Sequence, residues 1–148
     1  MSGLQLFDDR LSALINNLSP AARKEMTRAI AKKLRASQQQ NIKSQRAPDG
    51  TPFKPRRAEA GRNKKGRVKR EMFSKLRTAK YMKATATDSE AAVGFVGKVQ
   101  RMARVHHYGL RDRPARRGKE VAYDERPLLG ISKANTKLIE DIIVQHLK

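Results

Sequence analysis

Two stretches near the start of the chain carry apolar residues at helical spacing. In residues 4–18 the apolar positions recur at steps of three, four and one, as in an amphipathic helix; they are Leu4, Phe7, Leu11, Leu14, Ile15 and Leu18. Ser19 and Pro20 then predict a second helix, because serine can accept hydrogen bonds from first-turn amides and proline fits the first helical position. We expect this helix to run to about Ser44 and to form an antiparallel pair with the first.

Residues 47–55 cannot continue the second helix. They hold three prolines and a Pro-Asp-Gly turn within nine positions, and a proline inside a helix removes a hydrogen bond and clashes with the preceding turn. Residues 56–70 are strongly basic, include two glycines and have one large apolar side chain, Val68. Because such a segment can bury little apolar surface, we expect a mobile loop that becomes ordered only on binding.

After residue 80 the apolar pattern changes to the two-residue period of β-strands. Residues 81–87 and 91–97 are typical of strands, and the polar residues 88–90 between them are typical of a turn, which together predict a β-hairpin. A short helical turn is expected just before the hairpin, from the apolar residues Met72, Phe73 and Leu76.

A third helix is predicted over residues 99–108, with Gly109 as its C-terminal stop. We expect residues 110–120 to form a second basic loop and residues 121–123 a brief third strand. One side of the predicted helix carries Met102, Ala103 and His106.

The last helix is expected to open after Ser132, its natural N-cap, and its apolar stripe consists of Leu138, Ile139, Ile142, Ile143 and Leu147. These elements together predict an α+β fold, a small single domain in which helices flank a short, mostly antiparallel sheet and a long basic loop. We expect an N-terminal helical hairpin in residues 1–46, a Pro/Gly-rich basic loop in 47–70, and the β-hairpin plus helices in 71–148.

Positive charge is concentrated in the middle of the chain. The 148 residues carry 34 Lys and Arg against 14 Asp and Glu, a formal net charge of +20, and residues 41–83 hold 15 of the basic and 3 of the acidic side chains. Such a field attracts polyanions or acidic protein surfaces. The basic stretch 54–70 therefore either contacts nucleic-acid phosphates or docks on an acidic protein. Phe53 and Phe73 only bracket it, so base stacking and base-specific recognition are not expected.

The residue types present exclude several other functions. Cysteine is absent, which excludes disulfides, a thiolate zinc site and a cysteine nucleophile. No apolar run approaches the roughly 18–20 residues that span a bilayer, and no signal-peptide pattern opens the chain, so we expect no membrane contact and synthesis in the cytosol.

The sequence does not support catalysis. His106 and His107 are adjacent, so on a helix they point about 100° apart and are not expected to share a metal ion. Asp124 and Glu125 lie beside Arg126 and are expected to form a surface ion pair. No phosphate-cradling glycine loop or Ser-His-Asp grouping stands out. We therefore expect no enzyme activity, no cofactor and no metal site.

Four short motifs follow one another along the chain in a definite order. Gln45–Pro55 (QRAPDGTPFKP) follows a long helix, Met72–Arg77 (MFSKLR) leads to a hairpin, His106–Gly109 (HHYG) ends a short helix, and Arg126–Ser132 (RPLLGIS) precedes the closing helix. In this order the motifs resemble the phage virion morphogenesis family. The resemblance extends from about Phe7 to Leu147, and the basic loops are its least family-like parts.

The resemblance implies a structural role in the virion, at the head-proximal end of the tail, with assembly in the cytoplasm of the bacterial host. Such proteins are similar to small tail-completion and tail-terminator subunits, which cap a finished tail at its head-proximal end and allow it to join the head. It also implies rings, commonly of six copies. The implied partners are further copies of the chain, the tail tube and sheath proteins, the head–tail connector, and genome DNA in the lumen.

The matching motifs provide candidate contacts to subunits or partners: Pro48, Asp49, Gly50, Pro52, Phe53, Pro55, His107, Tyr108, Gly109, Arg126, Pro127, Leu128, Leu129 and Gly130. Phe53 either anchors a neighbouring subunit or fills the chain's own core, and the sequence favours neither. The cluster at residues 128–130 is more typical of core packing.

Candidate contacts to DNA or to an acidic protein surface lie in the basic loop: Arg56, Arg57, Arg62, Lys64, Lys65, Arg67, Lys69 and Arg70. If the loop lines a ring opening it would face the genome, and if it points outward it would meet acidic virion proteins. The rival interpretation of the whole chain is a small basic nucleic-acid-binding protein that uses residues 54–70 for phosphate contacts.

Overall fold

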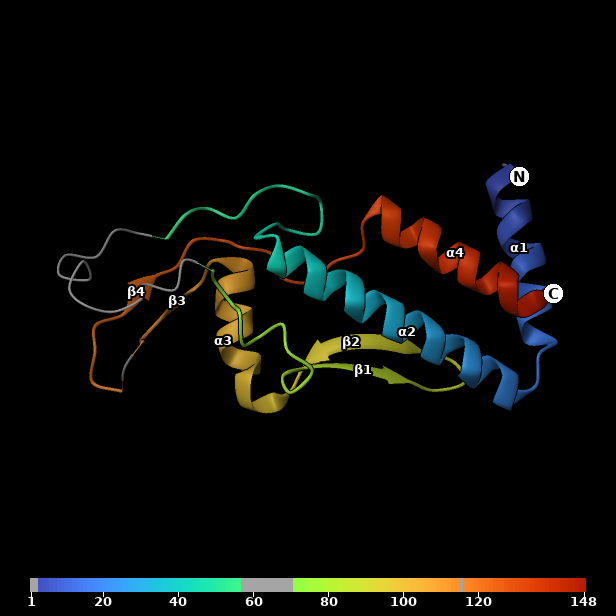
Figure 1. Cartoon of the computed structure of the whole chain (residues 1–148), viewed down its shortest axis with the longest axis horizontal. Helices are drawn as coiled ribbons and strands as arrows, with labels where there is room; N and C mark the ends of the chain where they lie inside the picture. The colour runs from blue at the N-terminus through green and yellow to red at the C-terminus, as the bar shows by residue number, and fades with distance from the viewer. Residues whose placement is uncertain (1–2, 57–70, 115) are drawn as a thin grey trace. The chain divides into compact units, whose positions relative to one another are not determined.

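The computed structural model describes residues 3–56, 71–114 and 116–148 (Figure 1). Within these ranges the helices and strands are α1 (Gly3–Asn16), α2 (Pro20–Lys43), β1 (Met82–Ala86), β2 (Ala91–Phe95), α3 (Gly97–Tyr108), β3 (Arg111–Asp112), β4 (Val121–Ala122) and α4 (Lys133–Leu147). The strands form two small sheets, β1–β2 and β3–β4. The α+β prediction is confirmed. The expected mobile loop at residues 57–70 lies outside the described residues.

The chain divides into two compact units, each built from separate stretches of sequence. The helical unit comprises Met1–Arg35, Ala84–Val93 and Lys133–Lys148, and the pocket unit comprises Ala36–Lys83 and Gly94–Ser132. Each unit has its own buried residues, so we describe each by itself.

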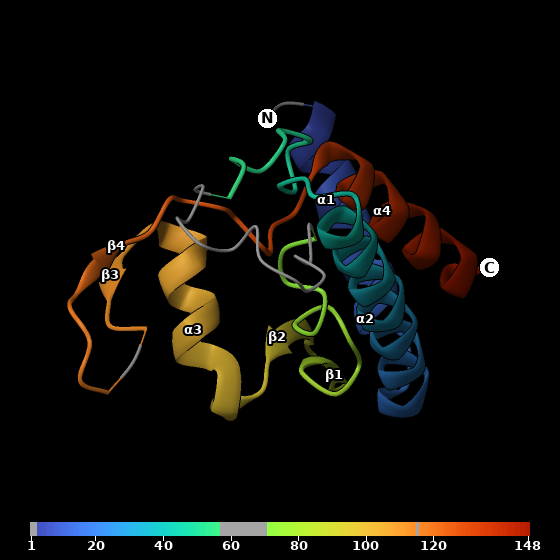
Figure 2. The ribbon, with the colours of Figure 1, turned by 60° about the vertical axis from the view of Figure 1, so that its left-hand side comes forward.

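The core of the helical unit lies between α2 and α4, which run side by side in Figures 1 and 2. Its centre consists of Met26, Ile30, Leu34 and Ile142, and Leu138, Ile139 and Ile143 pack against them as the apolar stripe of the last helix predicted. The Thr27 hydroxyl donates a hydrogen bond to the Thr87 carbonyl, which ties α2 to the turn of the β1–β2 hairpin.

The first helix and its junction with α2 follow the predicted pattern in part. A tight turn joins the two helices, and the Ala22 N–H donates to the Ser19 hydroxyl over 3.1 Å, which confirms the predicted cap. Ile15 and Leu18 pack against the helical core. Leu14, predicted in the same apolar stripe, is 51% exposed, so part of this stripe is uncovered.

In the pocket unit, α3 ends at the predicted glycine. Gly109 has φ +66°, and its N–H donates to the Val105 carbonyl, as expected of a left-handed C-terminal residue. Ala103 and Val105 are the buried residues of α3, whereas Met102, expected on the packed side, is 47% exposed. Ala103 is therefore packed as predicted, and Met102 is the member of the predicted side that lies at the surface.

The short helical turn expected before the hairpin is present: residues 72–77 form consecutive turns, and the Arg77 N–H donates to the Phe73 carbonyl over 3.2 Å. Phe73 itself has a left-handed backbone with φ +64°. One local prediction in the pocket unit is corrected. The region expected to be a loop contains β3, which pairs antiparallel with β4 in the register Arg111↔Ala122 and Asp112↔Val121. A charged strand of two residues carries no readable alternation, so the sequence pattern missed it.

Candidate functional site: an aromatic pocket beside the proline-rich turn

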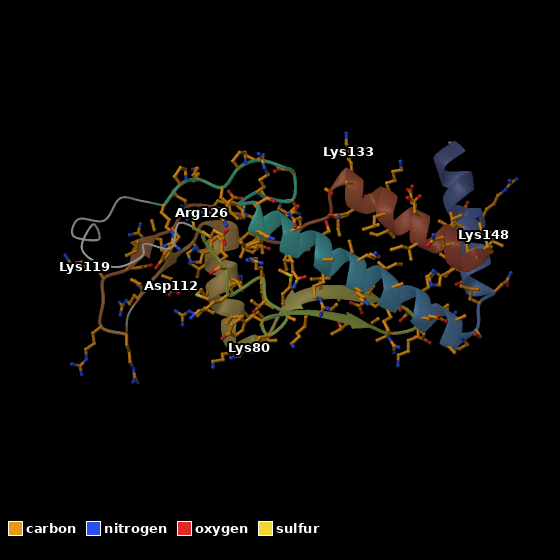
Figure 3. The ribbon with its side chains drawn as sticks, viewed as in Figure 1. Lys80, Asp112, Lys119, Arg126, Lys133 and Lys148 are labelled. Atoms are coloured by element: carbon orange, nitrogen blue, oxygen red, sulfur yellow. The ribbon has the colours of Figure 1, made fainter. Side chains whose placement is uncertain are left out.

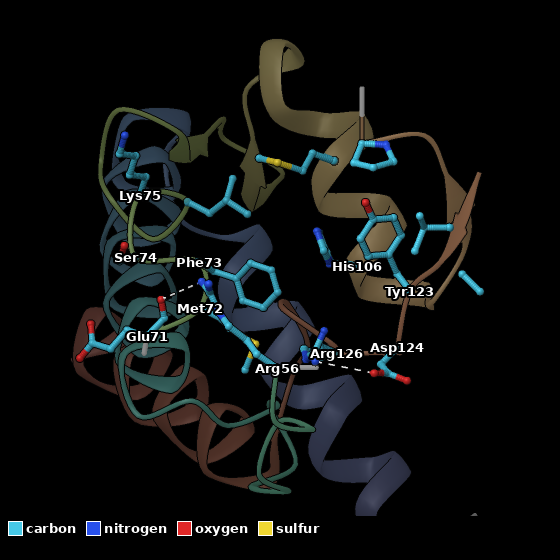
Figure 4. Close-up of a pocket in the computed structure, with 15 residues that line it drawn as sticks. Arg56, Glu71, Met72, Phe73, Ser74, Lys75, His106, Tyr123, Asp124 and Arg126 are labelled. Atoms are coloured by element: carbon cyan, nitrogen blue, oxygen red, sulfur yellow. Dashed lines mark hydrogen bonds and ion pairs between the residues drawn. The ribbon is translucent and has the colours of Figure 1, made fainter. Parts of the chain in front are cut away.

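A pocket of about 620 Å³ opens in the pocket unit (Figure 4). It is lined by the turns at residues 71–76, one side of α3 and the segment 121–126. Three aromatic rings contribute to its wall: Phe73, His106 and Tyr123. These rings come from three stretches that are far apart in the sequence, so only the folded chain forms this surface.

The aromatic rings form a continuous row that extends to the proline-rich segment. Phe53 and Phe73 pack edge to face with centroids 5.7 Å apart, Phe73 and His106 are 5.0 Å apart, and His106 and Tyr123 are 4.8 Å apart. Such pairs stabilise a fold beyond the apolar area they bury. Phe53 is only 8% exposed. Its burial favours the core role among the two that the sequence left open.

The proline-rich turn is held by its own backbone and by Asp49. The Ala47 N–H donates to the Thr51 carbonyl over 2.8 Å, and the Gly50 N–H donates to the Ala47 carbonyl over 2.9 Å. The Thr51 N–H donates to Asp49 Oδ1 over 2.9 Å, and this hydrogen bond lowers the pKa of Asp49. Gly50 has φ +90°, a conformation that favours glycine.

The other predicted contacts in this segment lie at its surface. Pro48 is half-buried, and the exposed residues are Asp49, Gly50, Pro52, Pro55 and Arg56. Arg56 donates to the Glu71 carbonyl over 3.3 Å at the pocket rim (Figure 4). The other candidate residues of the basic loop, Arg57, Arg62, Lys64, Lys65, Arg67, Lys69 and Arg70, lie outside the described residues.

Arg126 holds the proline-rich segment from inside the protein. Its Nε donates to the Lys54 carbonyl over 2.8 Å, and its Nη2 donates to the Pro55 carbonyl over 3.0 Å. Asp124 lies 3.8 Å from the same Nη2 (Figure 4). Arg126 is 6% exposed. The expected ion pair beside Arg126 is therefore present, but its arginine is buried and not at the surface. Three oxygens of its own chain compensate for the loss of water around the guanidinium.

Two glutamines connect the end of α2 to distant backbone, a feature that the sequence reasoning missed. Gln38 is buried; its Nε2 donates to the Gly130 carbonyl over 2.9 Å, and the Gly130 N–H donates to its Oε1 over 3.1 Å. Gln45 makes the same pair of bonds with Met72, both over 2.9 Å. A side-chain amide matches one peptide unit in this way. For Gln38, a polar residue on the apolar side of the predicted helix was the available signal, whereas Gln45 lies beyond the end of α2 at Lys43.

The two adjacent histidines have structural contacts. The Leu128 N–H donates to His107 Nδ1 over 3.0 Å, which requires that nitrogen to be unprotonated. Burial lowers the pKa of His107 against an opposing effect of Glu125, and burial together with the Arg126 charge lowers the pKa of His106. Across the described ranges, no group of three or more His, Asp or Glu side chains is placed to hold a metal ion.

These lowered pKa values predict a stability that depends on pH. Below the ordinary histidine pKa of 6.5, these histidines become protonated in the unfolded chain while they stay neutral in the folded chain. The free energy of unfolding therefore falls as the pH drops below about 6.5. Urea unfolding at a series of pH values, kept above the range near pH 4 where carboxylates titrate, measures this slope.

The variant His106→Phe is the control, because it keeps a ring between Phe73 and Tyr123 and removes one titrating group. Its stability should fall less steeply with pH than that of the natural protein. Equal slopes in the two proteins would contradict the role given to His106.

The remaining predicted contacts divide between core and surface. Leu128 is fully buried, which agrees with the packing role that the sequence favoured for the 128–130 cluster. Pro127, Leu129 and Gly130 are half-buried. Tyr108 is 59% exposed, and its ring packs on His107 with centroids 4.6 Å apart. Among the predicted residues described here, the exposed ones are therefore the turn at 49–52, Pro55, Arg56 and Tyr108.

The site thus presents an exposed turn held by hydrogen bonds and an aromatic pocket, surfaces of the kind that a partner molecule can cover. Among the described residues, no helix is long and apolar enough to cross a membrane.

Comparison with known proteins identifies the family. The model of the phage virion morphogenesis family matches residues 3–148. The chain is 42% identical over 149 residues to tail completion protein S of Escherichia phage P2, and the match covers 100% of this chain and 99% of the relative. No solved structure matches the chain. The protein belongs to the phage virion morphogenesis family, which confirms the resemblance of its four ordered motifs.

Proposed function

We propose that this protein completes the phage tail: it caps the head-proximal end of a finished tail and makes that end able to join the head. The observation that carries the proposal is the match to a tail completion protein along the full length of both chains. A match of this extent preserves the whole fold and not a single motif. The protein acts as a structural component, and its partners are other proteins of the tail and the head.

A ring of six copies is the assembly we propose for this cap. In a closed ring each subunit offers two different surfaces, one to each neighbour. Exposed apolar side chains suit such contacts, and the described ones include Leu14 in the helical unit and Tyr108, Leu110 and Ile131 in the pocket unit. The exposed turn at residues 49–52 is a further candidate contact, because its internal hydrogen bonds lower the entropy lost on binding.

The basic segment would serve this cap in one of two ways. The residues on either side of 57–70, Arg56 and Glu71, both line the aromatic pocket. If the segment lines the ring opening, its charge would favour passage of the genome, since cations attract phosphates without regard to base sequence. If it points outward, it would meet acidic surfaces of the tube, the sheath or the connector.

The test uses phage P2 lacking its own tail completion protein S. This chain, supplied from a plasmid, is expected to restore joined, infectious particles, and electron micrographs without it should show separate heads and tails. Deleting the gene from the phage that encodes this chain gives the same readout, and there the chain does not have to work with the proteins of a different phage.

Normal, joined and infectious particles from the deleted phage would overturn the proposed function. Unjoined particles, combined with strong binding of the isolated chain to duplex DNA and no association with tails, would support the rival interpretation as a free nucleic-acid-binding protein. In that case neutralising the basic loop should remove most of the salt dependence of binding.

A further inference from the structure

A second cavity, of about 470 Å³, adjoins the aromatic pocket. Met102 and Pro114 line both cavities, so the two share a wall. The other residues of the second cavity come from the first turns of α3 and from the β3–β4 hairpin, and they are Lys98, Arg101, Asp112, Arg113 and Arg116. One surface of the pocket unit thus combines an apolar hollow with a basic one.

The basic hollow has an excess of cations that the chain itself does not neutralise. Residues 97–120 hold 8 basic and 2 acidic side chains. Asp112 lies 2.8 Å from Arg101, and Glu120 lies 3.7 Å from Arg111. Figure 3 labels Asp112 and Lys119 on this hairpin. Exposed cations remain for which the described residues supply no ion pair: Lys98, Arg104, Arg113, Arg116, Arg117 and Lys119.

Like charges held this close repel one another, so an anionic partner that lies among them gains affinity. The same surface also exposes an apolar group at its centre. Met102 is 47% exposed, and the pocket beyond it has walls of Met72, Phe73, Leu76, Val121 and Tyr123. A flexible methionine next to aromatic rings is a surface that accommodates an apolar side chain.

A basic hollow next to an apolar pocket favours one kind of anionic partner over another. A DNA backbone offers phosphates but has no apolar side chain to fill the aromatic pocket. An acidic protein segment offers both carboxylates and an apolar side chain. We propose that this composite surface binds an acidic segment of a partner protein, with one large apolar side chain in the aromatic pocket and carboxylates on Arg113 and Arg116. The inference deepens the proposed function, on which it rests for the expectation that the partner is a virion protein.

The experiment measures fluorescence anisotropy with three labelled probes: a short peptide of Asp and Glu with one central Phe, the same peptide with Ser in place of Phe, and a duplex DNA. At physiological ionic strength the Phe peptide is expected to bind about tenfold more tightly than the Ser peptide, because it alone buries a large apolar side chain. Met102→Ser should weaken binding of the Phe peptide and leave binding of the Ser peptide nearly unchanged.

The contribution of charge is tested with the double variant Arg113→Glu, Arg116→Glu, which should lower the affinity for both peptides about tenfold or more. The matched control, Lys133→Glu with Lys148→Glu, makes the same change of net charge at exposed positions of the helical unit and should alter affinity less than about twofold. All of these side chains are exposed, and circular dichroism checks that each variant folds.

Equal affinity for the two peptides, or an effect of the control variant as large as that of the Arg113 and Arg116 variant, would overturn the inference. Tighter binding of duplex DNA than of either peptide, lost in the arginine variant, would replace it with a phosphate-binding surface. Head–tail joining in the phage assay tests the proposed function separately. If the peptides do not bind as expected while the chain still restores head–tail joining, only this inference is rejected.

Discussion

Replacing Gly109 with alanine is expected to lower the free energy of unfolding by about 3 kcal/mol. The backbone of Gly109 has φ +66°, which costs a residue with a Cβ about 1–2 kcal/mol. A Cβ at this position would also lie 2.7 Å from the Glu125 nitrogen and 2.9 Å from the Glu125 Cα. Since backbone atoms cannot rotate away, the segment at residue 125 has to move.

That movement would spread into the candidate site. The Arg126 N–H donates to the His106 carbonyl over 2.8 Å, so a shift at Glu125 pulls on α3 and on the arginine that holds the proline-rich segment. Urea unfolding followed by circular dichroism measures the loss of stability. Hydrogen exchange of the Arg126 amide shows whether the loss is centred here.

Two other glycines separate the causes of this loss. Gly50 has φ +90° and open space around its Cβ position, so Gly50→Ala should cost only the backbone term, about 1 kcal/mol. Gly97 has neither a positive φ nor a neighbour within reach, and Gly97→Ala should be neutral or slightly stabilising. A Gly109→Ala loss no larger than that of Gly50→Ala would contradict the close approach to Glu125.

Replacing Arg126 with alanine should likewise cost about 3 kcal/mol, because hydrogen bonds to a charged group contribute more than neutral ones and two carbonyls would lose their donor. Arg126 is the donor to Lys54 and Pro55, and it faces Asp124. Leaving Asp124 half-buried without its cation adds to the cost. Urea unfolding gives the total, and faster proteolysis near residue 55 would report release of the proline-rich segment.

Arg56→Ala is the matched control. Arg56 also donates to a backbone carbonyl, that of Glu71, but it is exposed and its bond is 3.3 Å long, so the expected cost is below about 0.5 kcal/mol. Arg126→Lys should lie between the two, since an ammonium keeps the charge but not the planar donor geometry. Similar losses for Arg56→Ala and Arg126→Ala would show that burial of Arg126 does not stabilise the segment.

Secondary structure and family were largely readable from the sequence. Both N-terminal helices, the β1–β2 hairpin, the Gly109 stop and the apolar stripe of α4 depend on periodicity and turn residues within short windows, where neighbouring side chains determine the backbone. The order of four short motifs was enough to indicate the family, which the match over residues 3–148 confirms.

The roles of single side chains depend on contacts between segments that lie far apart in the sequence, and only the tertiary structure shows these contacts. Arg126 meets the Lys54 carbonyl 72 positions away, and Gln38 meets Gly130 92 positions away, so the chain around each residue carries no sign of its partner. The sequence left Phe53 as either a subunit anchor or a core residue. The tertiary structure favours the core role, because Phe53 packs at the end of the row formed by Phe73, His106 and Tyr123. Burial depends on which distant surfaces meet, and that is a property of tertiary packing and not of local periodicity.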